Sequence, residues 1–209
     1  MNAFTSFGIV WFAISAGLCG LALPCAAAPG PVEAFASSYR LEAKKQYVEA
    51  GQSIEALAAA GNEFAQLRLA WLSYLQGKYE PAERAYAAII ERSPNAIEPR
   101  LGRMLPLMAA KRWDDAISEG QMVLNQSAWD YTAHVRLLAC EEAKGEWDLV
   151  EKRATQLAAN FPTDPTALVY IGRAKAFKGD KVAAREAYLQ VLERAPGNAE
   201  AAAQLKVLK

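Results

Sequence analysis

Histidine and cysteine, from which many catalytic and metal sites are built, are almost absent from this chain. It has one histidine and three cysteines in 209 residues. Cys19 and Cys25 fall in an apolar segment at the N-terminus, so the rest of the chain has Cys140 alone. A disulfide framework is therefore excluded, and the fold depends on packing for its stability.

The chain also lacks net charge. Its 23 basic and 23 acidic residues give a formal net charge of zero, and no basic arm or stripe stands out. Nucleic acid is therefore not an expected partner. There is no Gly-rich phosphate loop, nucleophile elbow or haem-attachment motif, so no small-molecule substrate is evident and no cofactor is expected.

The N-terminal segment reads MNAFTSFGIVWFAISAGLCGLALPCAAAPG. Residues 7–23 are apolar and uncharged, and small residues follow them. This order resembles a secretory signal peptide, residues 1–27, cleaved after Ala27, and it predicts a periplasmic protein. Because this segment has no Lys or Arg, an uncleaved anchor that holds the protein at the membrane, facing the periplasm, is the alternative.

A repeated pair of short amphipathic runs fills most of the chain. The clearest copy is DPTALVYIGRAKAFKGDKVAAREAYLQVLERAPGN, residues 164–198. Leu168 lies on one helix face with Gly172, which is small enough to let a second helix approach closely. Gly179 breaks the first helix, and Pro196 ends the second because proline cannot continue the hydrogen-bond ladder. Each copy is predicted to be an αα-hairpin whose apolar face needs neighbours.

A constant step of 34 carries this pattern back along the chain. Pro162 precedes Pro196 by 196 − 162 = 34, and Trp113 precedes Trp147 by 147 − 113 = 34. Four copies share this register, over residues 63–96, 97–130, 131–164 and 165–198. The pattern predicts an all-α solenoid of stacked antiparallel helix hairpins, with about four to five repeats and a C-terminal capping helix.

The period, the small residue in mid-hairpin, the aromatic before the second helix and the closing proline resemble the tetratricopeptide repeat family. This resemblance covers residues 63–198 and implies a right-handed solenoid. The second repeat departs from the family pattern, since Lys111 stands at the Gly position and Ala128 at the Pro position. In the third repeat, His134 stands at a position that is usually a large aromatic.

The two ends of the array are less regular. Residues 28–62 are predicted to form a divergent repeat or cap of two helices, and residues 58–72 also resemble the related Sel1-like repeats. Gly51 to Ser53 either break the second of these runs or are absorbed in it. Residues 199–209 are predicted to form the capping helix. Pro106 is expected to kink the first helix of the second repeat, because its ring presses on the carbonyl of residue 102.

Neither His134 nor Cys140 is predicted to be catalytic. No cluster of cysteines or carboxylates has metal-ligand spacing around His134, so no metal is expected, and its place in the repeat favours a packed imidazole. Cys140 falls where a hairpin needs a small residue, which favours a core position. The alternative, an enzyme that uses one of them, predicts that a single substitution abolishes function without disturbing the fold.

In the resembling family, the first helices of the hairpins line a concave groove. The groove positions carried onto this chain are Phe64, Leu67, Trp71, Tyr74, Leu101, Leu105, Met108, Val135, Arg136, Val169, Tyr170 and Arg173. Such an apolar and aromatic trough is typical of a surface that binds a partner. The clamp of Lys, Asn and Arg that co-chaperones use for a terminal carboxylate is not expected, because Leu67, Leu105 and Ala139 stand at its positions. The alternative is that some groove residues are core, or that the N-terminal helices cover them.

These observations predict a non-enzymatic periplasmic scaffold or adaptor that binds an apolar segment of an envelope protein. The resemblance makes outer-membrane assembly, secretion or pilus machinery, and polysaccharide export the expected settings. The alternative function is a chaperone-like maturation factor that presents unfolded clients such as apocytochrome c. In both cases the partner is a protein or peptide, and a membrane is reached only through that partner or an uncleaved signal.

Overall fold

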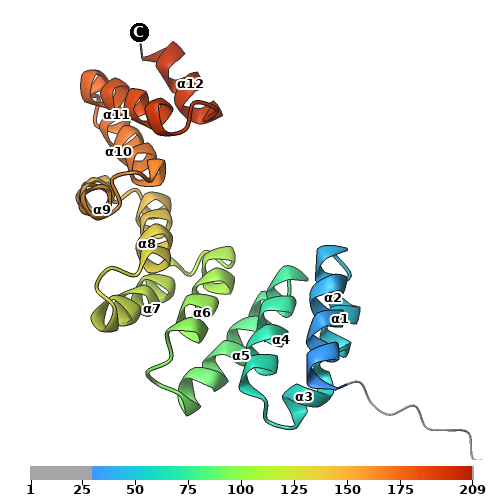
Figure 1. The fold of residues 1–209 in the computed structure, drawn as a ribbon. Helices are drawn as coiled ribbons and strands as arrows, with labels where there is room; N and C mark the ends of the chain where they lie inside the picture. The colour runs from blue at the N-terminus through green and yellow to red at the C-terminus, as the bar shows by residue number, and fades with distance from the viewer. Residues whose placement is uncertain (1–29, 209) are drawn as a thin grey trace, which may run out of the picture.

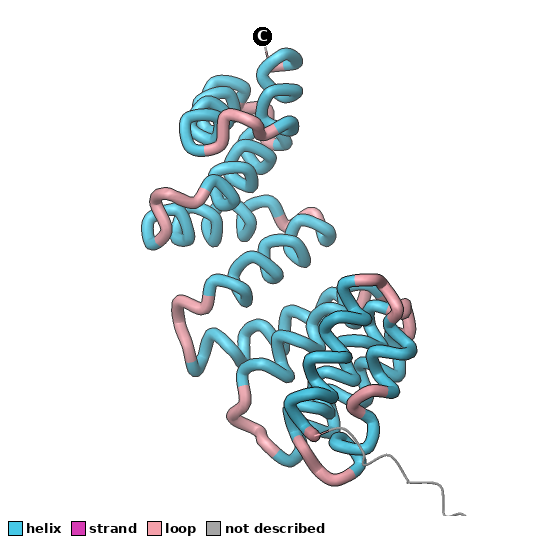
Figure 2. The backbone as a smooth tube through the Cα atoms, turned by 45° about the vertical axis from the view of Figure 1, so that its right-hand side comes forward, coloured by secondary structure: helices cyan, strands magenta, loops and turns pink. Residues whose placement is uncertain are grey.

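The computed structural model describes residues 30–208, which form twelve α-helices and no strand (Figures 1 and 2). The helices are α1 Pro31–Ala43, α2 Tyr47–Gln52, α3 Glu55–Ala59, α4 Glu63–Leu75, α5 Tyr79–Arg92, α6 Ile97–Ala109, α7 Trp113–Gln126, α8 Tyr131–Lys144, α9 Trp147–Asn160, α10 Pro165–Phe177, α11 Lys181–Arg194 and α12 Ala199–Val207. The hairpins follow one another in a curved stack from α1 to α12 (Figure 1). The predicted all-α solenoid is confirmed, whereas the proposed leader lies outside the described residues.

The first helices of the hairpins begin at a constant interval of 34. The steps from α4 to α6, from α6 to α8, from α8 to α10 and from α10 to α12 are 97 − 63, 131 − 97, 165 − 131 and 199 − 165. Side-chain caps fix several of these starts: Asn62, Asp130 and Asn198 each accept a hydrogen bond from the backbone N–H three residues on, at 2.9, 2.8 and 2.9 Å. Each such cap satisfies an amide that has no partner inside its helix.

The turn inside each hairpin requires a left-handed residue. Gly77, Gly145 and Gly179 have φ of 74°, 74° and 81° there, and Lys111 takes the same place with φ of 58°. Glycine adopts this conformation without a steric penalty, whereas a residue with a Cβ does not. The departure of the second repeat from the family pattern therefore changes the residue and keeps the turn.

The N-terminal hairpin differs from the prediction of two helices in residues 28–62. Its second run is divided into α2 and α3, with Ile54 between them at φ −120° and ψ 0°. The break directly follows Gly51 to Ser53, as one of the two alternatives predicted, and Ile54 lies in the core of the hairpin, fully buried in a cluster with Ala50 and Leu72. The hairpin is also shorter, because the starts of α1 and α4 differ by 63 − 31 = 32.

Helix α6 continues through Pro106 to Ala109. Pro106 is buried and has no amide hydrogen to give to the carbonyl of Gly102. The predicted kink stays a prediction. Among residues 30–208 no helix is both long enough and apolar enough to cross a membrane.

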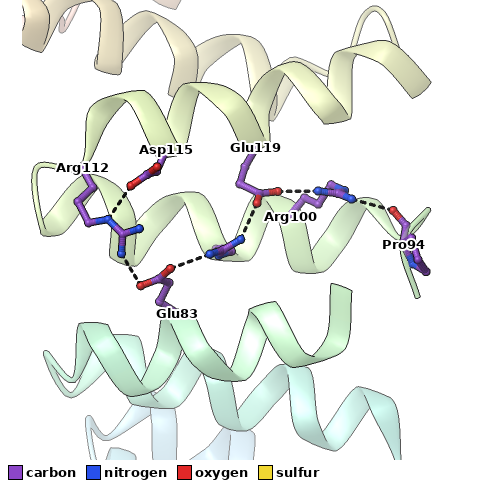
Figure 3. A network of polar contacts seen from close by, with 7 residues as sticks. Glu83, Pro94, Arg100, Arg112, Asp115 and Glu119 are labelled. Atoms are coloured by element: carbon purple, nitrogen blue, oxygen red, sulfur yellow. Dashed lines mark hydrogen bonds and ion pairs between the residues drawn. The ribbon is translucent and has the colours of Figure 1, made fainter. Parts of the chain in front are cut away.

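A network of ion pairs closes the seam between α5, α6 and α7 (Figure 3). Glu119 on α7 accepts from Arg100 and Arg103 of α6, each at 2.8 Å. Arg103 also reaches Glu83 on α5 at 2.7 Å, and Arg112 reaches the other oxygen of Glu83 at 2.7 Å. Arg100 and Glu119 are both buried, so these charges depend on one another for solvation.

The seam between α10 and α11 is apolar instead. The ring of Tyr188 lies directly on Gly172, where a Cβ would stand 2.8 Å from the ring. Leu168, Val191 and Ala201 join Tyr188 in one buried cluster. Glycine is therefore required at residue 172 by the closeness of the two helices.

Candidate functional site

A cavity of about 530 Å³ opens between α1, α4 and α6, on the side of the stack that the first helices line. Its lining consists of Tyr39, Glu42, Phe64, Leu67, Arg68, Trp71, Tyr86 and Glu98. Phe64 is 52% exposed and lies against the ring of Phe35 at 5.0 Å. The cavity therefore presents aromatic and aliphatic surface to any molecule that enters it.

Polar contacts hold the walls of this cavity in place. The guanidinium of Arg68 lies 3.5 Å above the ring of Tyr39, and its Nη2 is 2.7 Å from Glu42. The Trp71 indole N–H donates to the same carboxylate at 2.8 Å. Because Glu42 is engaged by a cation and an indole, its charge is balanced within the wall, and Trp71 is fixed with one edge on Glu42.

The floor of the cavity is formed by Tyr86 of α5. Its ring rests on Gly102 of α6, so closely that a Cβ there would overlap the ring. Tyr86 is only 4% exposed, and its hydroxyl has no hydrogen-bond partner in residues 30–208. Burial raises the pKa of Tyr86 to about 12, and the nearby charge of Arg136 opposes this rise. The hydroxyl is thus a protonated polar group in an apolar cavity.

Arg136 of α8 lies beside this floor. One of its N–H groups donates to the carbonyl of Leu101, the residue before Gly102, so Arg136 and Tyr86 meet consecutive residues of α6. Arg136 is partly buried, and burial lowers its pKa. In the described part of the chain no carboxylate lies within ion-pair distance of it, whereas Arg68 and Arg173 are both paired.

The structure brings together only part of the predicted groove. Phe64, Leu67 and Trp71 line the same cavity. Tyr74 lies outside it, between the rings of Trp71 and Tyr79 at 5.6 and 5.9 Å. These four residues form one continuous aromatic and aliphatic surface on α4.

The predicted residues of the second and third repeats lie outside the cavity and are partly buried. Leu101, Leu105 and Met108 are partly buried on α6, and Met108 packs against a core cluster that contains Cys140. Val135 is partly buried against the cluster of α8, α9 and α10. The middle of the array therefore has partly buried apolar side chains that do not line the cavity.

In the fourth repeat the structure favours the core alternative. Val169 and Tyr170 are each 9% exposed and belong to hydrophobic clusters. With Arg173 they border a separate cavity of about 250 Å³. Arg173 is held by Glu142 at 2.9 Å and Glu200 at 2.6 Å, so its charge is already neutralised.

Tyr39, Glu42, Tyr86 and Glu98 line the cavity, although none was among the predicted groove residues. Tyr86 belongs to a second helix, and it reaches the groove only because Gly102 leaves room for its ring. Tyr39 and Glu42 come from the hairpin that is out of step with the others. Of these four residues, only Glu98 could have been predicted from the repeat positions, because it follows the predicted groove residue Phe64 by one repeat step, 98 − 64 = 34.

The two candidate chemical residues are packed inside the stack. His134 is 5% exposed, and its Nε2 lies 3.0 Å from the carbonyl of Ala128. A carbonyl only accepts, so Nε2 carries the hydrogen and Nδ1 faces Arg153. Cys140 is fully buried, which raises its pKa to about 11 and keeps the thiol protonated at neutral pH. Within residues 30–208, no three His, Cys, Asp or Glu side chains are grouped to hold a metal.

A family model described as tetratricopeptide repeat matches residues 64–96 and 166–198, the first and fourth repeats. The chain is therefore a helical solenoid in which these two hairpins are tetratricopeptide repeats. No curated protein matches the sequence.

Several solved structures share this fold. The thermophilic protein TTC0263 of Thermus thermophilus matches with a TM-score of 0.65 and 17% identity, over 85% of this chain and 97% of that one. A tetratricopeptide repeat protein from Parabacteroides merdae matches with a TM-score of 0.73 and 14% identity, over 85% and 71%. YrrB, described as a protein with an unusual peptide-binding site, matches with a TM-score of 0.65 and 14% identity, over 85% and 92%. At these identities the likeness concerns the fold.

Proposed function

We propose that this protein is a non-enzymatic periplasmic scaffold that holds a polypeptide segment of an envelope protein against its first helices. The observation that carries the proposal is the cavity between α1, α4 and α6, where Phe64, Leu67 and Trp71 present apolar surface that no element of residues 30–208 covers. Contiguous apolar surface of this kind usually marks a partner site. Three successive first helices line or border this surface, which suits an extended or helical segment.

Chemistry within the chain supports binding rather than catalysis. Cys140 and His134 are enclosed in the stack, and the strongest polar groups are engaged in ion pairs with one another. The cavity contains apolar side chains, a hydroxyl and carboxylates, which provide complementarity for a side chain of a partner. The likeness to YrrB, whose description names a peptide-binding site, favours the same class of ligand.

The periplasmic location rests on the leader-like residues 1–27. Its test is mass spectrometry of the protein from a periplasmic extract, where the mature chain is expected to begin near Ala28. An intact Met1 in a membrane fraction that resists carbonate extraction would reject cleavage and favour the anchored form.

Binding is tested by photo-cross-linking in cells. A photoreactive residue at Leu67 or Leu105 is expected to cross-link one envelope protein, and the same residue at Arg185, exposed on the second helix α11, is the matched control. The Leu67→Glu, Leu105→Glu double variant, shown to be folded by circular dichroism, should lose the adduct formed from Tyr74. Equal cross-linking from Arg185 and Leu67 would reject the groove. Cross-links to many unfolded soluble clients instead of one envelope protein would favour the maturation factor.

A further inference from the structure

The cavity combines largely apolar walls with the hydroxyl of Tyr86, and Arg136, which lies beside the cavity without lining it, has no ion pair in the described chain. The carboxylate of Glu98 also lines the cavity, without an ion pair in residues 30–208. Tyr39, Phe64 and Leu67 are side chains of the wall, and the hydroxyl of Tyr86 lies at the floor without a hydrogen bond to the protein. Covering a hydroxyl without giving it a partner costs free energy, because its hydrogen bonds to water are lost. A ligand that reaches the floor avoids this cost only by offering an acceptor or a donor there.

The charge expected of the ligand group that binds the Tyr86 hydroxyl follows from the position of Arg136. This guanidinium contacts the carbonyl of Leu101, one residue from the point where the Tyr86 ring rests on Gly102. The other two arginines of this face are neutralised, Arg68 by Glu42 and Arg173 by Glu142 and Glu200. Arg136 therefore places a guanidinium without an ion pair within residues 30–208 beside the floor, with Asp130 as the nearby carboxylate that acts on its pKa. A guanidinium and a phenolic O–H both donate to a carboxylate.

Resting on the proposed function, we propose that the partner segment carries an internal Asp or Glu whose carboxylate binds Arg136 and the Tyr86 hydroxyl, beside a bulky apolar side chain seated between Tyr39, Phe64 and Leu67. The carboxylate belongs to a side chain within the segment, because apolar residues of the groove lie on both sides of Arg136. Leu101 and Leu105 precede it, and Val135 and Ala139 follow on its own helix. A chain that ended at Arg136 would leave one of these surfaces without contact.

Selection from a library of displayed short random peptides tests this assignment. Peptides that bind the wild-type protein should be enriched in an aromatic or large aliphatic residue close to an Asp or Glu. The Arg136→Glu variant should select Lys or Arg at the same spacing from the apolar residue. Arg40→Glu is the matched control, because Arg40 is an exposed arginine of α1 that does not line the cavity. This control should select the wild-type pattern.

A selected peptide, synthesised with a C-terminal amide, then gives the contribution of each group. Arg136→Gln should weaken its binding about ten- to hundredfold and Tyr86→Phe about tenfold, as for hydrogen bonds to a charged group. Tyr86→Phe should keep the wild-type melting temperature, because the Tyr86 hydroxyl bonds to no group of residues 30–208. Arg136→Gln should lower it by a few degrees, because the hydrogen bond to the Leu101 carbonyl is lost, and circular dichroism should show that both variants are folded. Replacing the peptide's Asp or Glu by Asn or Gln should abolish the difference between Arg136→Gln and wild type.

The outcomes separate this inference from the proposed function. If apolar peptides are enriched without an acidic residue, or if Arg136→Glu selects the same peptides as wild type, the carboxylate assignment fails and the scaffold proposal stands. If peptides bind only with a free C-terminal carboxylate, the internal acid is rejected. If no peptide binds any variant above background, both proposals fail together.

Discussion

Repeats two and four have the same backbone step and close their seams with opposite chemistry. Each residue of the seam in repeat four has a counterpart two repeat steps earlier: Arg100 for Leu168, Arg103 for Ile171, Glu119 for Ala187 and Gly120 for Tyr188. In repeat four an aromatic ring fills the seam against Gly172. In repeat two Gly120 leaves that space to Leu137 and Met104, and the charged residues pair beside it (Figure 3).

This difference shows that the solenoid requires complementary seams and does not require apolar ones. A buried ion pair is weak evidence for stability, because removing charges from water costs about as much as their attraction returns. Removing only one partner of the pair, however, strongly destabilises the protein, because the other charge stays buried without compensation. The family model matches repeat four and leaves repeat two unmatched, in keeping with the four polar or small replacements in that seam.

Removing one partner from the polar seam should have the largest effect. Glu119→Ala leaves Arg100 and Arg103 without their shared carboxylate, and it should lower the free energy of unfolding by about 3–5 kcal/mol in denaturant titrations. The double variant Arg100→Leu, Glu119→Leu removes both charges of the buried pair and leaves Arg103 with Glu83. This double variant should recover most of the free energy of unfolding that Glu119→Ala loses. A double variant as unstable as Glu119→Ala would show that the polar seam cannot be replaced by an apolar one.

Adding one methyl group at a glycine of each seam should lower the melting temperature most where the two helices are packed most closely. Gly172→Ala places a Cβ 2.8 Å from Tyr188, and Gly102→Ala places one still closer to the ring of Tyr86. Overpacking of this kind costs about 1–3 kcal/mol, with the larger loss expected at Gly102. Gly197→Ala is the control, since no atom lies within 4 Å of the place that its Cβ would take. Equal melting temperatures for all three variants would contradict the packing described for both tyrosines.

The polar seam should also make stability depend on pH. Burial raises the pKa of Glu83, but hydrogen bonds and charges from Arg103 and Arg112 outweigh it, so the pKa of this carboxyl lies below its ordinary 4.5. A depressed folded-state pKa stabilises the protein above the unfolded value, and this contribution is lost as pH falls through the folded pKa. The melting temperature should therefore decline below about pH 4.5. Glu83→Gln should remove part of that decline, and an unchanged pH profile would show that Glu83 is not coupled to folding.

The smallest effect is expected at the turns. Lys111→Gly should raise the free energy of unfolding by about 1 kcal/mol, because φ of 58° strains a residue with a Cβ. The reciprocal Gly179→Ala, at φ of 81° and with open space around it, should lower it by a similar amount. Opposite shifts in the denaturant midpoint support the shared turn geometry. A loss of stability in Lys111→Gly would mean that the lysine side chain contributes more than its strain costs.

The constant repeat step and the all-α solenoid were predictable because Gly, Pro and aromatic residues mark each hairpin locally. The break between α2 and α3 was one of two alternatives left open at Gly51 to Ser53, because the sequence does not show how Ile54 fits a core formed with α4. The cavity was predicted in part. Phe64, Leu67 and Trp71 followed from repeat positions, whereas Tyr86 reaches the floor through the absence of a Cβ at Gly102, a contact between separate helices. Tyr170 occupies a groove position by sequence and a core position by packing.

The ion pairs around Glu83 also affect which repeats can be neighbours. In an array of similar hairpins, a helix that docks one repeat out of place meets nearly the same apolar surface, and recombination between copies can exchange them. Arg103 and Arg112 both require the carboxylate of Glu83 on α5, and the residue one step later, 83 + 34 = 117, is Ile117. A slip by one repeat in this direction would therefore remove the α5 carboxylate from both guanidinium groups and leave Arg103 with Glu119 and Arg112 with Asp115. This polar contact therefore disfavours that register of the first two repeats while the chain folds.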